Sequence, residues 1–378
     1  MIFVLDLLSD CVIPLVTSTV KWRVLIFCKF HNCVTICSSV VKENELCYDF
    51  YGIGTGLAIL KTNRNRSEQI MKAGGYMHQI NYKMTVQYEG TRYKGWQKQP
   101  RIDNTIQGKL ETLLSRLLET DIEVFGAGRT DAGVHALGQT ANFWVSEKQL
   151  NTFTKKYPSL KASWSSTAAR AQAIISADLN GAAGQHANEN ADTRAAKRSA
   201  QVLSQDAMLL EALNHYLPDD IAIPKIVRAS DRFHARYLTS SKWYQYRIRI
   251  APFPDVMNRR FLWQYGEDLD TEAMLRASRA LLGTHDFTSF CGLKMKKSAV
   301  RTITQIDISR PDDNTIVLDY YGDGFLNHMV RLLTGELVEV GAGRSEESAV
   351  KAILEAQKKG AACHTAPASG LTLMEVRY

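Results

Sequence analysis

Cysteine is scarce over most of this 378-residue chain. Five of its seven cysteines lie in the first 76 residues, and the rest of the chain contains only Cys291 and Cys363. So few cysteines in a body of this size argue against a disulfide-stabilised secreted scaffold, and we expect a reducing, cytoplasmic compartment. The stretch Cys28–Cys37 also contains a histidine, but its spacing fits no standard zinc finger and predicts no metal site.

The chain also lacks the features of a targeting or membrane segment. Asp6 and Asp10 interrupt its apolar start, and both precede the first basic residue. This order disfavours a transmembrane span, a secretory signal and a transit peptide, so we predict no membrane association. We expect the functional protein to begin near Met77 or Met84, with residues 1–76 as an N-terminal extension outside its core.

Two glycine-rich stretches lack the patterns that bind nucleotides. Gly126 and Gly128 are followed by Asp131 where a dinucleotide fingerprint has its third glycine, and no P-loop lysine pattern occurs anywhere. The second stretch, Gly341–Glu346, begins with the same Gly-Ala-Gly-Arg letters. It predicts the end of one helix and the start of another, with Ser345 as the N-cap. Neither stretch is a dinucleotide fingerprint.

The hydrophobic pattern beyond the first 76 residues predicts an α+β fold. Apolar residues repeat at helical spacing from Ile106 to Leu118, with Asn104 and Gln107 as a capping pair at the start. Two similar α/β halves would merge their sheets and leave a cleft between them. The expected strands cover residues 81–88, 122–125, 139–144, 221–227, 242–250, 302–308 and 315–321, and the expected helices cover 105–118, 206–216, 271–282 and the stretch after Gly324.

The most informative stretch is the loop Phe125–Ala136, which carries one carboxylate, Asp131, among glycines. Glycines permit backbone angles closed to other residues and let another segment approach closely. A turn in a β-hairpin is the simplest interpretation. The other interpretation is an active site, in which the neighbouring Arg129 pairs with Asp131, because a paired arginine keeps a carboxylate ionised in a dry pocket. The loop by itself leaves both interpretations open.

Basic and aromatic residues are interleaved in two segments, 88–101 and 228–249. Cations bind phosphates and aromatic faces stack on bases, so both segments indicate a nucleic-acid partner. In the second segment, strand alternation places Tyr244 on one face and Trp243 on the other, where we expect a core residue. The net charge of +7 and the pI near 8.9 agree with an RNA partner but are common in other proteins.

These segments and three others occur in the order found in TruA-type tRNA pseudouridine synthases, which the chain resembles over about residues 78–150 and 206–378. The motifs are Tyr88–Thr91 with Gly95–Gln97, Gly128–His135, Phe233–Arg236 with Tyr244 and Tyr246, His285–Phe290, and Gly324–Arg331. The resemblance implies isomerisation of uridine to pseudouridine in the tRNA anticodon stem-loop, at nucleotides 38, 39 and 40, without a metal or an organic cofactor. It also implies a mostly antiparallel central sheet flanked by helices, and a homodimer.

The resemblance also assigns roles to residues. It implies Asp131 as the catalytic nucleophile, Arg331 as its basic partner, Arg129 as the residue that manages the flipped nucleotide, and Tyr244 as a contact of the target base. The other expected substrate contacts are Thr130, Arg92, Lys94, Trp96 and Arg236. The residues alone leave open whether Asp131 attacks the ribose C1′ or the base, or removes a ribose proton.

Two other functions are weighed against this one. A tRNA-binding or tRNA-folding protein of the same fold without catalysis would be expected to have lost its carboxylate, whereas Asp131 is present. A nucleoside glycosidase would need a second carboxylate, for which Asp286 and Asp323 are the candidates. The histidines in the motifs have no metal-ligand spacing, so we predict no metal site.

Composition and the family resemblance also predict the boundaries between the parts of the chain. Residues 161–205 contain 13 alanines in 45 positions and few large apolar side chains, which indicates a flexible insertion. The predicted parts are the N-terminal extension (1–76), an N-terminal catalytic subdomain (77–150), an alanine-rich insertion (151–205), the remainder of the first half (206–250) and a C-terminal subdomain (251–378).

Overall fold

The computed structural model describes residues 79–157, 204–293 and 298–378, together with the backbone of four strands near the N-terminus. The chain forms two compact units, Met1–Gly75 and Tyr76–Tyr378. The first contains the antiparallel strands β1 (Phe3–Asp6), β2 (Cys11–Leu15), β3 (Trp22–Cys28) and β4 (Cys33–Ser39), which pair in chain order. Most of the predicted alanine-rich insertion, residues 158–203, lies outside the described residues.

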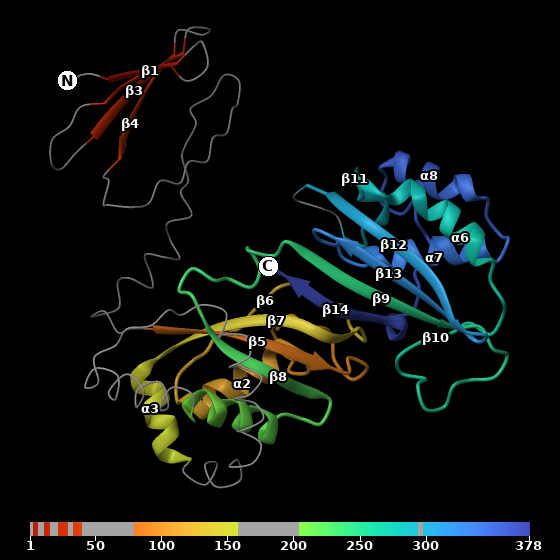
Figure 1. Ribbon diagram of the computed structural model, residues 1–378, viewed down its shortest axis with the longest axis horizontal. Helices are drawn as coiled ribbons and strands as arrows, with labels where there is room; N and C mark the ends of the chain where they lie inside the picture. Colours follow the sequence, from red (N-terminus) through yellow and green to blue (C-terminus); the bar gives the residue numbers. More distant parts are fainter. Residues whose placement is uncertain are drawn as a thin grey trace, which may run out of the picture. The chain divides into compact units, whose positions relative to one another are not determined.

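The second unit is built on one ten-stranded sheet (Figure 1). Its main path is β11-β12-β13-β9-β14-β7-β5-β8, with β10 beside β9 and β6 beside β7. The strands are β5 (Gln79–Tyr88), β6 (Phe125–Gly126), β7 (His135–Ser146), β8 (Ile221–Ala229), β9 (Ser241–Arg249), β10 (Trp263–Gln264), β11 (Gly283–Asp286), β12 (Val300–Asp312), β13 (Thr315–Gly322) and β14 (Leu371–Arg377). Among the strand pairs that the structure describes in this sheet, only β14–β7 and β10–β9 are parallel. The predicted α+β fold with a mostly antiparallel sheet is confirmed.

The C-terminal strand β14 joins the two halves of this sheet. It pairs antiparallel with β9 on one side, where Leu373 faces Tyr244, and parallel with β7 on the other, where Thr372 faces His135. The loop that precedes β7 and the aromatic residues of β9 are therefore brought to the same part of the sheet, although they lie far apart in the chain.

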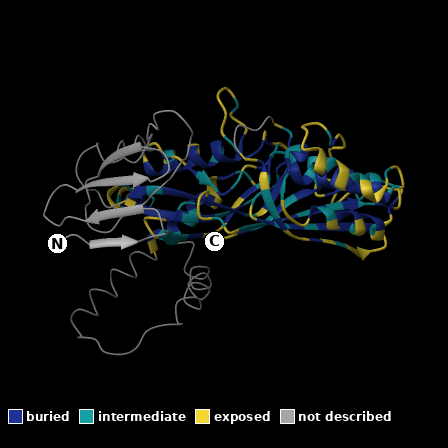
Figure 2. Cartoon of the chain, turned by 90° about the horizontal axis from the view of Figure 1, so that it is seen from above, coloured by how far each residue is buried: buried dark blue, intermediate teal, exposed yellow. Residues whose placement is uncertain are grey.

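Helices cover each half separately (Figure 1). The helix α2 (Ile106–Leu118), the helix α3 (Glu147–Lys156) and a helix over residues 204–216 accompany β5 and β8, whereas α6 (Thr271–Ser278), α7 (Met329–Gly341) and α8 (Glu347–Ala356) gather beside β11 to β13. Short 3₁₀ turns occur at Arg279–Leu281, Thr288–Phe290 and Ala368–Gly370. Figure 2 shows buried residues along the strands and exposed residues mainly on loops and outer helix faces.

The spacing of apolar residues agrees with these helices, whereas the predicted N-cap residues differ from those in the structure. In α2 the repeating leucines are buried, but the N-cap is Thr105, whose hydroxyl accepts a hydrogen bond from Gly108 N at 3.2 Å, and not Asn104. The side chain of Asn104 instead donates to the carbonyl of Arg92. At α8 the N-cap is Glu346 without a side-chain bond, so the prediction of Ser345 was wrong.

Two further expectations are corrected by the structure. The strand expected over residues 122–125 is reduced to the two residues of β6, which lengthens the connection from α2. Trp243 is half-buried, with its Nε1 donating to Asp319 Oδ1 at 2.6 Å, because the core face of β9 is the one that carries Tyr244 and Tyr246. Among the helices in the described ranges, none combines the length and the apolar character needed to cross a membrane.

Candidate active site

The loop between β6 and β7 is held by side chains and backbone of the sheet next to it. Ala127 N donates to Thr140 O at 2.8 Å, and the side chain of Gln139 donates to Gly128 O at 2.8 Å. From β9, the ammonium of Lys242 donates to Ala127 O at 3.1 Å. A Cβ atom on Gly128 would lie 2.9 Å from this ammonium, so the glycine gives the lysine room to reach the backbone.

The basic segment after β5 packs directly against this loop. Trp96 N donates to Thr130 O at 3.1 Å, and Gly133 N donates to Tyr93 O at 3.3 Å. The approach is so close that a Cβ on Gly90 would lie 2.0 Å from the carbonyl oxygen of Val134. Backbone bonds and glycines on both segments therefore fix the path of the loop up to its carboxylate.

Asp131 faces the segment that leads into α7. Its Oδ1 accepts a hydrogen bond from Asn327 Nδ2 at 3.0 Å, and its Oδ2 lies 3.6 Å from Arg331 Nη1 and 3.7 Å from His328 Nε2. The Asp131 side chain is 18% exposed. The carboxylate is thus surrounded by donors from one distant segment while one side stays open to solvent.

Arg331 is itself fixed in place. Its Nε donates to Ala366 O at 2.7 Å, while its own carbonyl accepts from Ala366 N at 3.1 Å. These two bonds hold the guanidinium from one side, so that Nη1 points to Asp131. His328, which precedes α7, has φ of 60°, a left-handed conformation that is unfavourable for a residue with a side chain. Strain of this kind is common where a site fixes the positions of its side chains.

Tyr244 completes the group on the sheet side. Its ring is buried and meets Phe325 edge-on at a centroid distance of 5.2 Å. Burial raises the pKa of Tyr244 well above its usual value, and the nearby Tyr88 and Asp131 raise it further. The phenol therefore keeps its proton, and it can act as a packing surface or a hydrogen-bond donor but not as a base.

Comparison with known proteins shows the family to which this chain belongs. A model of the tRNA pseudouridine synthase family matches residues 84–157 and 277–378. The chain is 34% identical over 299 residues to tRNA pseudouridine synthase A 2 of a Bacillus cereus strain, and 36% identical over 299 residues to tRNA pseudouridine synthase A of a Bacillus species (strain KSM-64). Each alignment covers 79% of this chain and 99% of the relative. The chain belongs to the tRNA pseudouridine synthase family.

The structure brings together only some of the residues that the sequence singled out. Asp131, Arg331 and Tyr244 converge, with Thr130 next to them, where its hydroxyl lies 2.8 Å from Tyr88 Oη. Arg129 is exposed and has no carboxylate partner in the described ranges, so the expected pairing of Arg129 with Asp131 is not found.

The expected substrate contacts differ in accessibility. Lys94 and Arg236 are exposed, and Arg92 is exposed but bonded to Asp220 at 2.6 Å. Trp96, in contrast, is 2% exposed, because its ring fills the space left by the missing side chain of Gly126. The ring therefore belongs to the core, and this burial disfavours its interpretation as a stacking surface for a base.

Two residues around the carboxylate were missed by sequence reasoning. Asn327 and His328 lie in the same motif as Arg331, and that position was the one signal that pointed to them. The two carboxylates considered for a glycosidase each accept hydrogen bonds from a threonine residue. Asp286 accepts from Thr288 N and Oγ1, and Asp323 accepts from Thr302 N.

His135 has a structural role in this protein. It is buried, and its Nδ1 accepts a hydrogen bond from Gly90 N at 3.0 Å, which leaves the proton of the neutral ring on Nε2. Burial lowers the pKa of His135, so the ring is neutral at physiological pH. It joins the start of β7 to the turn after β5, and its ring nitrogens are not among the partners of Asp131 in the described ranges.

Proposed function

We propose that this chain isomerises uridine to pseudouridine in the anticodon stem-loop of tRNA, at nucleotides 38, 39 and 40, with Asp131 as nucleophile. The observation that carries the proposal is the setting of Asp131, an accessible carboxylate held by Asn327 and Arg331 close to a buried tyrosine. Membership of the tRNA pseudouridine synthase family supplies the reaction class.

The chemistry requires one carboxylate and a pocket for a detached base. The bond from ribose C1′ to N1 of uracil breaks, and a bond from C1′ to C5 forms. C5 loses a proton and N1 gains one, so no atoms are gained or lost and no electrons are exchanged with a carrier. Asp131 attacks C1′ and leaves again when C5 attacks the same carbon. Arg331 Nη1, 3.6 Å from Asp131 Oδ2, orients the carboxylate for its attack and faces the negative charge that returns when Asp131 leaves C1′.

A nucleotide within a stem must leave the helix before Asp131 can reach it. Flipping a base out costs a few kcal/mol in lost stacking and pairing. Arg129 follows Gly128 at the exposed edge of the loop and has no competing acid in the described ranges, so it is free to enter the vacated space or to bind the flipped backbone. Tyr244 would pack against the flipped uracil, while Lys94, Arg92 and Arg236 would bind tRNA phosphates.

The proposal is tested with unmodified tRNA transcripts and the purified full chain. Pseudouridine is mapped by carbodiimide treatment and reverse transcription, and we expect stops confined to nucleotides 38, 39 and 40. Transcripts with cytidine at these three positions serve as the matched control and should give none. Modification at other nucleotides would contradict the assigned position.

The same experiment distinguishes the proposed enzyme from the alternative, a tRNA-binding or tRNA-folding protein without catalysis. That alternative predicts binding of the transcript with no pseudouridine at any nucleotide. We favour the enzyme because Asp131 is present and surrounded by bound partners. In agreement with the family resemblance, we also propose a cytoplasmic homodimer, for which light scattering should give the mass of two chains.

A further inference from the structure

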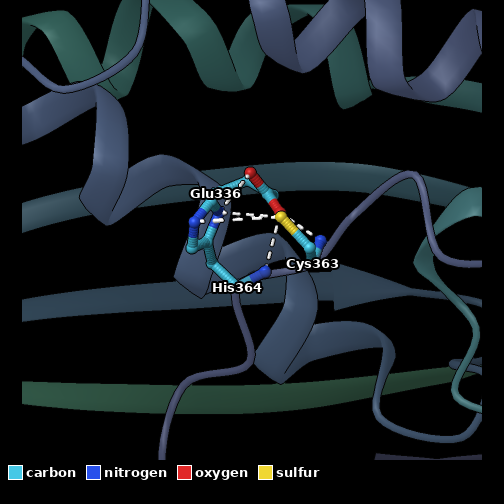
Figure 3. A group of neighbouring side chains, drawn as sticks. All are labelled: Glu336, Cys363 and His364. Atoms are coloured by element: carbon cyan, nitrogen blue, oxygen red, sulfur yellow. Dashed lines mark hydrogen bonds and ion pairs between the residues drawn. The ribbon is translucent and has the colours of Figure 1, made fainter.

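We propose that Glu336, Cys363 and His364 form a binding site for one Zn²⁺ ion. The three side chains lie together on α7 and the segment that precedes β14, and one ligand atom from each lies within 4.8 Å of the others. Figure 3 shows the thiol and the imidazole drawn around the carboxylate of Glu336. The inference does not depend on the proposed reaction.

Two separations between the donor atoms are close to those around tetrahedral zinc. At bond lengths of about 2.3 Å to sulfur and about 2.0 Å to nitrogen or oxygen, a sulfur and a nitrogen ligand lie about 3.5 Å apart, and a nitrogen and an oxygen ligand about 3.3 Å. Here Cys363 Sγ lies 3.5 Å from His364 Nδ1, which lies 3.1 Å from Glu336 Oε2. The third separation, from Cys363 Sγ to the Glu336 carboxylate, is at most 4.8 Å, and Cys363 Sγ also lies 3.8 Å from His364 Nε2. Binding of the ion therefore requires a rotation of the exposed side chains, which already lie close together.

The carboxylate is oriented by bonds that leave one oxygen for the metal. Glu336 is 4% exposed, and its Oε1 accepts from the backbone N–H of Cys363 at 2.8 Å and of His364 at 3.0 Å. Its Oε2 meets only the ring of His364 among the contacts in the described ranges. Hydrogen bonds that orient a metal-binding carboxylate in this way typically strengthen the site.

The segment that carries the other two ligands is pressed onto α7. A Cβ on Gly335 would lie 1.9 Å from the carbonyl oxygen of His364, so only glycine lets this backbone approach the helix. Further along, Ala366 exchanges two hydrogen bonds with Arg331. The ligands are thus held at both ends of a short docked segment, which lowers the entropy lost when a metal binds.

The donor types select the cation. A thiolate, an imidazole and a carboxylate suit Zn²⁺, whereas Mg²⁺ and Ca²⁺ prefer oxygen ligands alone. The side chains of Cys363 and His364 are exposed, so an ion can enter from solvent and keep a water as its fourth ligand. Binding converts the thiol to a thiolate and releases its proton to solvent.

The test uses the full chain with the five N-terminal cysteines replaced by serine, so that Cys291 and Cys363 are the only thiols. Co²⁺ titration should give the thiolate charge-transfer and tetrahedral absorption bands at one ion per chain, and Zn²⁺ should displace Co²⁺. Cys363→Ser and His364→Ala should each weaken Zn²⁺ binding by at least about 100-fold, and Glu336→Gln by at least about tenfold. Cys291→Ala is the matched control and should bind as before.

Two results would overturn the site. One is the absence of a thiolate band at stoichiometric Co²⁺, and the other is a band that survives Cys363→Ser. Because Cys363 and His364 are exposed, their variants should keep the circular dichroism spectrum of the parent, so a loss of binding is not explained by unfolding. Mg²⁺ in excess should leave the Co²⁺ spectrum unchanged.

Discussion

The letters Gly-Ala-Gly-Arg occur twice in this chain and take two different structures. At Gly126–Arg129 they leave β6 and form a loop pinned by the Trp96 ring and the ammonium of Lys242. At Gly341–Arg344 they end α7, where Gly343 has φ of 68° and Gly343 N and Arg344 N bond back to the last turn of the helix. The second glycine of the first copy faces a lysine, and that of the second faces open space.

The arginines of the two copies, Arg129 and Arg344, differ in their partners. Arg344 forms a two-pronged ion pair with Glu339 of the preceding helix α7, at 2.7 Å for both nitrogens. Its pKa is raised chiefly by these hydrogen bonds. Arg129 has no such partner in the described part of the chain and remains free for a substrate. Of the two copies, only the first is therefore suited to bind an anion. Three matched pairs of substitutions and one lysine variant test this difference between the two loops.

The largest expected effect concerns the acids two residues after each arginine. Asp131→Asn removes the proposed nucleophile, so we expect kcat for pseudouridine formation to fall at least about 10³-fold while tRNA binding changes little. Glu346→Gln is the matched control and should keep full activity, because its carboxylate reaches only the exposed Ser348 among the described residues. Single-turnover assays and filter binding measure both quantities. An active Asp131→Asn enzyme would remove Asp131 from the chemistry.

The next pair is Arg129→Ala and Arg344→Ala. Loss of Arg129 should lower kcat/KM by about 10²-fold, because it removes a positioning contact made only with flipped RNA, and thermal stability should not change. Loss of Arg344 should lower the free energy of unfolding by at most about 1 kcal/mol, since its ion pair is exposed, with no effect on activity. Equal activity in the two variants would show that Arg129 does not serve the substrate.

The third pair is Gly126→Ala and Gly341→Ala. A Cβ at Gly126 would lie 2.5 Å from the buried Trp96 ring, and overpacking of this kind costs about 1–3 kcal/mol. It would also shift the loop, so we expect about a tenfold loss of activity. A Cβ at Gly341 would meet Met274 Sδ at 2.7 Å, but methionine adapts readily, so the loss of stability should be smaller and activity should be retained. Chemical denaturation and single-turnover assays on the same preparations separate the two effects. Full activity in a destabilised Gly126→Ala protein would show that the loop tolerates movement.

Local sequence patterns predicted the fold and singled out the carboxylate, but they did not predict the environment of the carboxylate. Strand alternation and helical spacing are local, so β5, β9 and α2 were found within a few residues. The contact between Asp131 and Asn327 spans 196 positions and depends on how two halves meet at β14, which no local pattern encodes. Chain proximity suggested Arg129 as the partner of Asp131, whereas the family resemblance pointed to Arg331, whose Nη1 lies 3.6 Å from Asp131 Oδ2.

Trp96 shows a second limit of local reasoning. An aromatic residue between cations is typical of an RNA-binding surface, yet this ring is buried because Gly126, far along the chain, leaves space for it. The metal ligands proposed beside α7 are a third case, because Glu336 lies 27 positions before Cys363 and no spacing rule connects them. Residues whose role depends on a neighbour across the fold need the structure.

The smallest expected effect tests the lysine that distinguishes the two loops. Burial, and after it the positive charges of Arg236 and Arg301, lower the pKa of Lys242 to about 8, against the opposing effect of the negative charge of Asp323. Above pH 8 the unfolded chain binds a proton that the folded chain has lost, so the stability of the wild type should rise with pH up to about 10. Lys242→Met should lack this rise. We therefore expect the free energies of unfolding of the two proteins to diverge by an amount of the order of 1 kcal/mol as the pH increases. Denaturation at several pH values measures the difference between the two proteins, in which the tyrosine ionisations common to both cancel. Parallel curves for the two proteins would mean that Lys242 is not desolvated under the loop.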